Sequence, residues 1–293
     1  MTIKDSLRNY SLAVENIDLI TISSINNVYK CYCREGVFIA KEYLNESLFN
    51  VNSVIVHEKL NKLINLTPKI VKTKNNSLFS YQDGKYTLLT NFVENKEYGK
   101  EKTSEICYLL KYLHKQLEHF YFSETNYKKD YHQIQSSLER YQKNNLCMKE
   151  KELLNIRKTY NMKFKFGYSP KVFSNIHGDF KKENVLLNNQ NKFQVIDFDY
   201  VGYKDLYVEV CRAACEFSEF DDVLFFEFLM QYFNNKNTEV YKCILDYFTY
   251  LIFSDFPLGI KNIINTNNYY FLLNNRIMII NFIYNQLIKG GIL

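Results

Sequence analysis

Three side chains with hard oxygen donors, Asp179, Asn184 and Asp197, lie in one polar stretch of the sequence, residues 177–199. The stretch predicts a loop and then two short strands joined by the Asn-rich turn at 188–191. Because the polar residues stand at the ends of these strands, we expect the three side chains to converge. Two carboxylates and an amide oxygen are ligands that suit Mg²⁺ carried by a nucleotide.

The order of these residues has a known parallel. The pattern H-x-D-x-x-x-x-N, followed by a β-turn-β unit and an Asp at a strand end, resembles the catalytic segment of protein-kinase-like phosphotransferases. His-Gly-Asp at 177–179 and Ile-Asp-Phe-Asp at 196–199 are similar to the aminoglycoside phosphotransferase superfamily. That superfamily includes choline/ethanolamine kinases, homoserine kinase-like enzymes and spore-coat kinase-like proteins. The other explanation is an acidic hairpin that carries His-Gly-Asp by chance.

The resemblance implies a role for each polar residue of the loop, with ATP and Mg²⁺ as cofactors. Asp179 would orient the acceptor hydroxyl and take its proton, while Asn184 and Asp197 would hold Mg²⁺. His177 would organise the loop through hydrogen bonds. Two readings remain open for Asp199, which either supports the metal site or only solvates the loop.

A single lysine, Lys41, lies among apolar residues in the predicted strand 37–43. A buried ammonium group without a partner is costly, so Lys41 needs a carboxylate. The resemblance implies that this lysine contacts the phosphates of ATP and pairs with a helical Glu. Glu58 is the only acidic residue of the predicted helix 51–64, so we predict a Lys41–Glu58 ion pair. The alternative is that both side chains lie separately on the surface.

The resemblance also assigns nucleotide contacts by position. The turn at 23–27, which ends at Asn27, would cover the phosphates, although it contains no G-x-G-x-x-G. That absence argues against a protein kinase more than against the resembled superfamily, whose turn is often poor in glycine. The predicted strand 86–93 leads into a polar, hinge-like segment, where the backbone of Asn91 and Val93 would contact adenine.

The composition is that of an ordinary globular protein. Of its 293 residues, 46% are hydrophobic, and the chain has only 9 Gly and 3 Pro. A sizeable core in one large domain or two lobes is therefore expected. The net charge of +5 comes without a long run of Lys or Arg, so we expect no nucleic-acid partner.

The cysteines and the apolar runs of the sequence indicate in which cellular compartment the protein is expected. The seven cysteines include no zinc-like C-x-x-C pair, and buried free thiols in a reducing cytosol explain them most simply. The first ten residues lack the apolar region of a signal peptide. No apolar run approaches the length of about 18 residues that suggests a membrane span. We expect a cytoplasmic protein without a membrane partner.

The predicted elements give an α+β chain with a bilobal, protein-kinase-like fold. Residues 1–94 would form a small N-lobe with a nucleotide-binding β-sheet and one key helix. Residues 95–293 would form a larger, mainly helical C-lobe that carries the catalytic loop and the acceptor site. The periodicity of apolar residues predicts the C-lobe helices 101–120, 127–142, 148–160, 208–217, 221–233, 239–253 and 270–288.

Two features of the loop favour a small-molecule acceptor over a protein. Gly178 stands where protein kinases have the Arg that binds a phosphorylated activation loop, and few residues separate Asp197 from the next helix. Glu209 stands where the relatives commonly have a buttressing Asp, which puts that structural role in doubt. The carboxylates of segment 209–222, together with the nearby aromatic residues Tyr200, Tyr203, Tyr207 and Phe217, would attract a cationic acceptor. The alternative is an ordinary solvated helix end with its aromatic residues turned to the core.

The predicted function is ATP-dependent transfer of the γ-phosphate to a hydroxyl of a small molecule. An amino sugar, an amino alcohol such as choline or ethanolamine, and a homoserine-like compound are the acceptor classes that the resemblance implies. A second reading is a spore-coat kinase-like nucleotide-binding or structural protein with weak or no catalysis. Against it stand Lys41, Asp179, Asn184 and Asp197, four residues that an inactive relative has no chemical need to keep together.

Overall fold

The structure is a computed structural model that describes residues 3–22, 26–122, 147–163, 172–253 and 266–291. Its chain divides into two compact units. The first unit consists of residues 1–98 and 177–201, and the second of residues 99–176 and 202–293. The polar stretch thus groups with the N-terminal residues in the first unit. The predicted lobes, with their boundary at residue 94, stay a prediction. The predicted helix at 127–142 lies outside the described residues.

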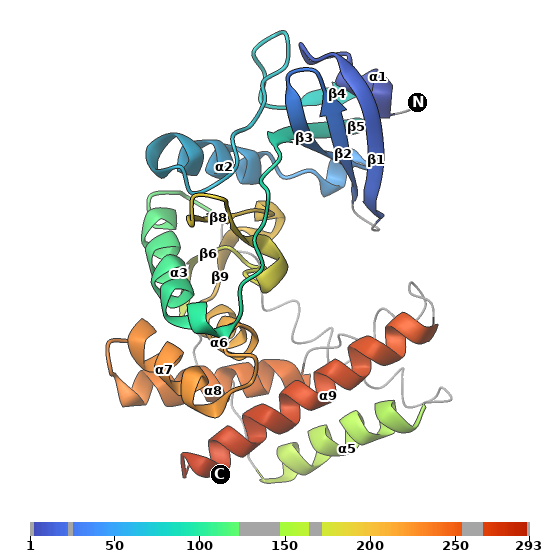
Figure 1. Ribbon diagram of the computed structural model, residues 1–293. Helices are drawn as coiled ribbons and strands as arrows, with labels where there is room; N and C mark the ends of the chain where they lie inside the picture. The colour runs from blue at the N-terminus through green and yellow to red at the C-terminus, as the bar shows by residue number, and fades with distance from the viewer. Residues whose placement is uncertain (1–2, 23–25, 123–146, 164–171, 254–265, 292–293) are drawn as a thin grey trace. The chain divides into compact units, whose positions relative to one another are not determined.

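The first unit is built on an antiparallel five-stranded sheet (Figure 1). The order of its strands is β1 (Val14–Ile22), β2 (Asn26–Cys33), β3 (Gly36–Tyr43), β5 (Lys85–Asn91) and β4 (Ser80–Gln82). Hairpin turns at 34–35 and 83–84 join neighbouring strands, and Asp83 takes the positive φ of 52° that such a turn needs. One face is buried on a core that contains Cys31, Ala40 and Leu89, together with the short helix α1 (Ile3–Leu7).

Helix α2 (Val51–Ile64) forms over the residues predicted for it. The side chain of Asn50 accepts the N–H of Asn52 at its start. Asn65 ends the helix in the left-handed conformation, with φ 52°. His57 of α2 is buried and meets the Pro68 carbonyl oxygen at 2.6 Å, and burial lowers its pKa to about 4. The neutral ring therefore serves packing, as expected of an ordinary helix residue.

The rest of the first unit is the loop and hairpin that carry the polar stretch. The hairpin consists of β7 (Val185–Leu187) and β8 (Phe193–Val195). The 3₁₀ turns are η1 (Glu46–Leu48), η3 (Lys182–Asn184) and η4 (Phe198–Tyr200). The segment after β5 is tied to the hairpin, because Lys96 N–H donates to the Leu187 carbonyl at 2.8 Å and the side chain of Asn95 accepts the Leu187 N–H at 2.8 Å.

The second unit is mainly helical (Figure 1). Its elements are η2 (Lys100–Lys102), α3 (Thr103–Leu117), α5 (Met148–Lys163), β6 (Phe173–Ile176), β9 (Gly202–Asp205), α6 (Leu206–Phe217), α7 (Asp222–Tyr232), α8 (Asn237–Phe253) and α9 (Thr266–Lys289). Within the described ranges of this unit, the helices predicted for the C-lobe are confirmed to within a few residues at their ends. The antiparallel pair of β6 and β9 was not predicted, since four residues give too short a pattern.

Side-chain caps and buried apolar faces define these helices. Asp205 accepts the N–H groups of Tyr207 and Val208 and so starts α6. The core of these helices includes four buried cysteines, Cys107, Cys211, Cys215 and Cys243, whereas Cys147 is partly exposed, and all five thiols are free. Burial raises the pKa of Cys107 to about 12, so this thiol stays protonated. Among the described helices, none combines the length and apolar character that spanning a membrane requires.

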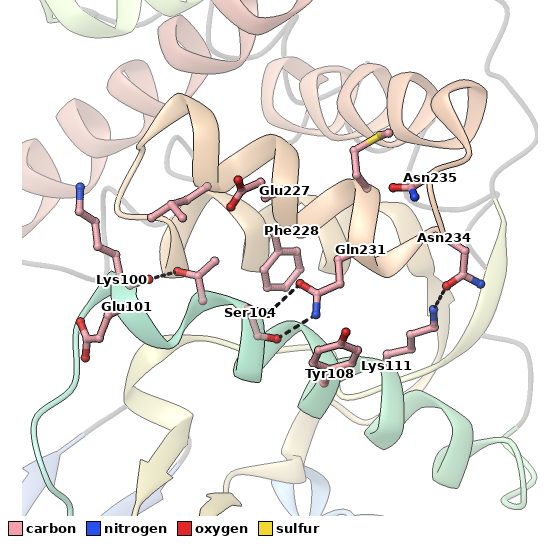
Figure 2. Close-up of a pocket in the computed structure, with 13 residues that line it drawn as sticks. Lys100, Glu101, Ser104, Tyr108, Lys111, Glu227, Phe228, Gln231, Asn234 and Asn235 are labelled. Carbon is pink, nitrogen blue, oxygen red and sulfur yellow. Dashed lines mark hydrogen bonds between the residues drawn. The ribbon is translucent and has the colours of Figure 1, made fainter.

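A groove runs between α3 and α7 of the second unit (Figure 2). Ser104 and Gln231 exchange two hydrogen bonds across it, at 3.1 and 3.2 Å. The Lys111 ammonium donates to the Asn234 side-chain oxygen at 2.6 Å. These contacts join the two helices, so these polar side chains of the groove serve helix packing.

Candidate active site

The loop that begins at His177 is fixed by hydrogen bonds to its own strand ends. His177 is fully buried, and its Nδ1 accepts the Asp179 N–H at 3.3 Å. The other ring nitrogen, Nε2, lies 3.0 Å from the Ile196 carbonyl oxygen and donates to it. Between them, Gly178 has φ 86°, a left-handed conformation that glycine adopts without strain. These bonds are the kind that the predicted organising role of His177 requires.

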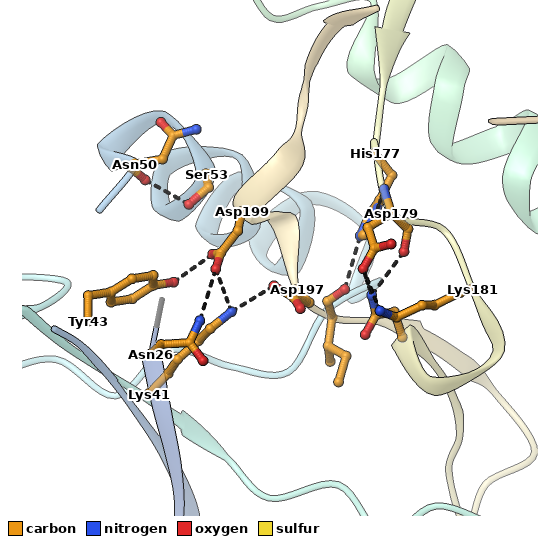
Figure 3. Close-up of polar contacts among 12 residues, drawn as sticks. Asn26, Lys41, Tyr43, Asn50, Ser53, His177, Asp179, Lys181, Asp197 and Asp199 are labelled. Carbon is orange, nitrogen blue, oxygen red and sulfur yellow. Dashed lines mark hydrogen bonds and ion pairs between the residues drawn. The ribbon is translucent and has the colours of Figure 1, made fainter. Parts of the chain in front are cut away.

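Asp179 lies beside an amide and an ammonium group (Figure 3). Asn184 Nδ2 donates to the Asp179 carboxylate at 3.0 Å and to its backbone carbonyl at 2.9 Å. The Lys181 ammonium is 2.8 Å from the same carboxylate oxygen, Oδ2. Lys181 belongs to the same loop as Asp179. The geometry places it on the carboxylate proposed as the base.

Lys41 connects the sheet to the end of the polar stretch (Figure 3). Its ammonium is 2.7 Å from Asp197 Oδ1 and 2.7 Å from Asp199 Oδ2. Burial alone would lower the pKa of Lys41, but the two carboxylates outweigh it and raise the pKa. For Asp197 the two effects are reversed: burial alone would raise its pKa, but Lys41 holds the pKa below its usual value. Lys41 and Asp197 are therefore both charged at neutral pH.

Asp199 has two further donors. The Tyr43 hydroxyl donates to Asp199 Oδ1 at 2.6 Å, and Asn26 Nδ2 approaches Oδ2 at 3.4 Å. Burial and the nearby carboxylate raise the pKa of Tyr43, so its hydroxyl keeps the proton that it donates. Sequence reasoning missed Tyr43, although its position two residues after Lys41 puts both side chains on one face of β3.

The predicted pair of Lys41 and Glu58 is wrong. Within the described residues, the partners of the Lys41 ammonium are Asp197 and Asp199, and Glu58 pairs with Lys62 at 2.9 Å. The physical reason is that Lys62 stands one turn along the same helix, a favourable spacing for a Glu–Lys pair. Two carboxylates of the loop meanwhile offer Lys41 more charge than one helical Glu.

This arrangement predicts that Glu58→Gln changes nucleotide affinity less than about 2-fold. It should cost only about 0.5 kcal/mol of folding stability, the usual size of a helical Glu–Lys pair. Titration of the variant with ATP and a denaturant unfolding curve measure the two effects. Lys62→Met, which removes the other member of the same pair, is the matched control. A large loss of ATP affinity in Glu58→Gln alone would reinstate Glu58 as a nucleotide-site residue.

The other predicted nucleotide contacts lie around the sheet. Asn27 stands near the start of β2, and its side-chain oxygen is buried without a hydrogen-bond partner. The Asn91 N–H donates to the Lys69 carbonyl at 2.9 Å, so this group is already used and an adenine contact would fall to another backbone atom. Val93 follows the end of β5. The roles of Asn27, Asn91 and Val93 stay predictions.

Three carboxylates of the acidic segment 209–222 have partners within the second unit. Glu209 is buried and lies 2.7 Å from His114 Nε2, while His114 Nδ1 lies 2.6 Å from the Tyr232 hydroxyl. Asp221 pairs with Lys100 at 3.0 Å, and Asp222 pairs with Lys289. His114 is thus a packed residue of the helical core. Three carboxylates expected to attract a cationic acceptor are engaged inside the unit.

The donors of the first unit fit a magnesium nucleotide. The described parts of the chain contain no group of three or more His, Cys, Asp or Glu side chains that could hold a metal ion by themselves. Asp197 and Asn184 offer one carboxylate and one amide oxygen, and Mg²⁺ in nucleotide sites typically takes one or two carboxylates with the phosphates. The residue types therefore suit an ion that arrives with its nucleotide.

Comparison with known proteins gives a family match and a fold match. The model of the phosphotransferase enzyme family matches residues 167–241, which include the whole polar stretch. A comparison with curated proteins gives no match.

Solved structures of low sequence identity share the fold over nearly the full chain. An aminoglycoside phosphotransferase from Alicyclobacillus acidocaldarius is 14% identical, with a TM-score of 0.66 over 99% of this chain and 96% of that one. A choline kinase from Streptococcus pneumoniae is 16% identical, with a TM-score of 0.61 over 98% and 96%. Spectinomycin phosphotransferase in complex with ADP and spectinomycin is 10% identical, with a TM-score of 0.61 over 92% of each chain. The predicted resemblance is confirmed: the chain has the protein-kinase-like α+β fold of the aminoglycoside phosphotransferases and choline kinases, and its polar stretch matches the phosphotransferase enzyme family.

Proposed function

We propose that this protein is an ATP-dependent phosphotransferase that moves the γ-phosphate to a hydroxyl group of a small molecule. The observation that carries the proposal is the meeting of Lys41 with Asp197, in the unit that also holds Asp179 and Asn184. A similar structure binds ADP and spectinomycin, which supports the use of a nucleotide and a small acceptor here.

Phosphoryl transfer asks a protein mainly for positioning and charge neutralisation. Asp179 would accept the hydroxyl proton of the acceptor and orient its oxygen, while Asn184 keeps the carboxylate in place. Lys41 and Lys181 would face the phosphates with their ammonium groups. Asp197 and Asn184 would hold Mg²⁺, which neutralises phosphate charge when it is bound.

The loop geometry supports a small acceptor. Gly178 provides no guanidinium to bind a phosphorylated loop, and its φ of 86° disfavours replacement by arginine. The described chain passes from η4, which ends at Tyr200, to α6, which begins at Leu206. A long activation segment has no place between them. We therefore propose an amino sugar, an amino alcohol or a homoserine-like compound as acceptor, with a cationic compound preferred.

The test is ATP consumption by the purified protein with a panel of hydroxyl compounds. Amino sugars, choline, ethanolamine, homoserine and matched neutral and anionic alcohols are compared, with the Asp179→Asn variant as background. We expect one class to stimulate ADP formation and to yield a phosphorylated product by mass spectrometry. Tight ATP binding without stimulation by any class would favour the nucleotide-binding or structural reading instead. A best acceptor that is anionic would remove the preference for a cation.

A further inference from the structure

Asp199 has more partners than the carboxylate proposed to hold the metal. Its Oδ1 accepts the Tyr43 hydroxyl at 2.6 Å, and its Oδ2 meets the Lys41 ammonium at 2.7 Å and Asn26 Nδ2 at 3.4 Å (Figure 3). Its side chain is 12% exposed, against 31% for Asp197. Asp199 is therefore the more enclosed of the two carboxylates, and its contacts come from two neighbouring strands, β2 and β3.

Tyr43 is itself rigidly placed. Its side chain is 1% exposed, and its ring packs edge-on against Phe49 with the centroids 5.0 Å apart. The Lys41 ammonium lies 5.4 Å from the same ring. A hydroxyl on a buried, packed ring has little freedom to follow a moving partner. The hydrogen bond thus fixes Asp199 to the sheet.

We propose that Asp199 is a positioning residue: held by Tyr43 and Asn26, it fastens the turn 197–199 to strands β2 and β3 and so places Asp197 and Lys41 for the nucleotide. This inference rests on the proposed function for its consequence in catalysis. The contact itself exists whether or not the protein transfers phosphate.

The backbone of the turn explains why such a fastening is useful. Asp197 has φ 66° and ψ 64°, a left-handed conformation that is disfavoured for residues with a Cβ. A strained residue keeps its conformation only where its surroundings fix it. Lys41 fixes Asp197 directly, and Asp199 fixes the turn two residues later. With both carboxylates on one ammonium, a shift of either would move the other.

Charge gives a second reason for the extra donors. One ammonium faces two carboxylates, and burying an unbalanced carboxylate is costly without hydrogen bonds. The Tyr43 hydroxyl and the Asn26 amide supply these bonds, and bonds to an ionised acceptor are about twice as strong as neutral ones. These bonds and Lys41 hold the Asp199 carboxylate beside Asp197 without any contribution from Glu58.

The experiment removes the Tyr43 hydroxyl and keeps the ring. Tyr43→Phe should lower kcat/KM for ATP about 10-fold, the size expected for a hydrogen bond to a charged group, mainly by raising KM. A purely structural defect would reduce the amount of active protein and so lower the apparent kcat at unchanged KM. Tyr86→Phe is the matched control, because Tyr86 is paired with Tyr43 across β3 and β5 and stacks on the same Phe49.

A double-mutant cycle tests the contact itself. Asp199→Asn and Tyr43→Phe are combined, and the thermal unfolding of the four full-length proteins is compared without nucleotide. If Tyr43 acts through Asp199, Tyr43→Phe should lower the midpoint in the wild-type background and have much less effect in Asp199→Asn. The same non-additivity is expected in KM for ATP.

The outcomes separate this inference from the proposed function. Additive effects on unfolding, or equal KM values for Tyr43→Phe and Tyr86→Phe in an active enzyme, would overturn the positioning role. The protein could also transfer no phosphate and still show non-additive unfolding in the double-mutant cycle, with ATP affinity lost in Tyr43→Phe and kept in Tyr86→Phe. That result would refute the proposed activity and retain the positioning role. Unchanged ATP affinity in Tyr43→Phe, measured by calorimetry on such a protein, would overturn the inference as well.

Discussion

Asp179→Asn is expected to reduce turnover by about 10²- to 10⁴-fold, the usual contribution of an oriented general base. The substitution keeps the shape of the side chain and removes its ability to take the acceptor proton. The Asn184 bond to the Asp179 backbone carbonyl, at 2.9 Å, does not depend on the carboxylate, so the loop should keep its conformation. Folding and nucleotide affinity should therefore change little.

The measurement is steady-state turnover with the best acceptor of the panel, together with ATP affinity and a thermal unfolding curve. Glu183→Gln is the matched control, because it removes an exposed carboxylate from the same loop. Near-full activity of Asp179→Asn would exclude Asp179 as the base. A similar loss in both variants would point to the loop's overall charge instead.

The parts of the fold that could be predicted are those with strong local patterns. The sheet hairpins follow from turn residues such as Asp83-Gly84, and helix α2 follows from its 3.6-residue apolar period. The polar stretch could be placed for a similar reason, since its hairpin turn at 188–191 fixes which residues stand at strand ends. Local patterns predict local geometry because the atoms that decide it are close in sequence.

The partners of charged groups were harder to predict. The sequence offered Lys41 several carboxylates, and only the folded chain shows that Asp197 and Asp199 reach it while Glu58 turns to Lys62. Residues 41 and 197 are far apart in sequence, so no periodicity relates them. Tyr43 was missed for the same reason. An aromatic residue in a strand is normally interpreted as a core residue, and no neighbouring residue in the sequence indicates that its hydroxyl contacts a carboxylate.

The acidic segment shows a second limit of sequence patterns: its composition suggested a charged surface, whereas three of its carboxylates have partners within the unit. Glu209 is buried against His114, and Asp221 accepts two N–H groups at the start of α7 as well as pairing with Lys100. Capping and internal pairing are the ordinary uses of acidic residues near helix starts. Charge in a sequence therefore predicts a binding surface poorly until its internal partners are known.

Asp197→Asn should weaken binding of Mg-ATP strongly and leave binding of metal-free ATP unchanged or slightly improved. Substitution of groups that merely support a metal ligand typically costs about 10- to 100-fold in metal affinity, and loss of a charged ligand should cost at least as much. Without metal, the substitution removes a carboxylate that competes with phosphate for the Lys41 ammonium, 2.7 Å away. The substitution should therefore lower the affinity for Mg-ATP and not lower the affinity for metal-free ATP, so comparing the two affinities is a sensitive test of metal binding.

Asparagine is the right replacement because residue 197 has φ 66°, a conformation that asparagine tolerates and alanine does not. Asp83→Asn is the matched control, since Asp83 is an exposed aspartate of the same unit with φ 52°. Calorimetric titration with ATP is run in excess Mg²⁺ and again in a chelator. Equal losses under both conditions would mean that Asp197 serves only to hold Lys41, and no loss under either would remove it from the nucleotide site. A loss confined to Mg-ATP, absent in Asp83→Asn, is the result expected of a carboxylate that binds the metal.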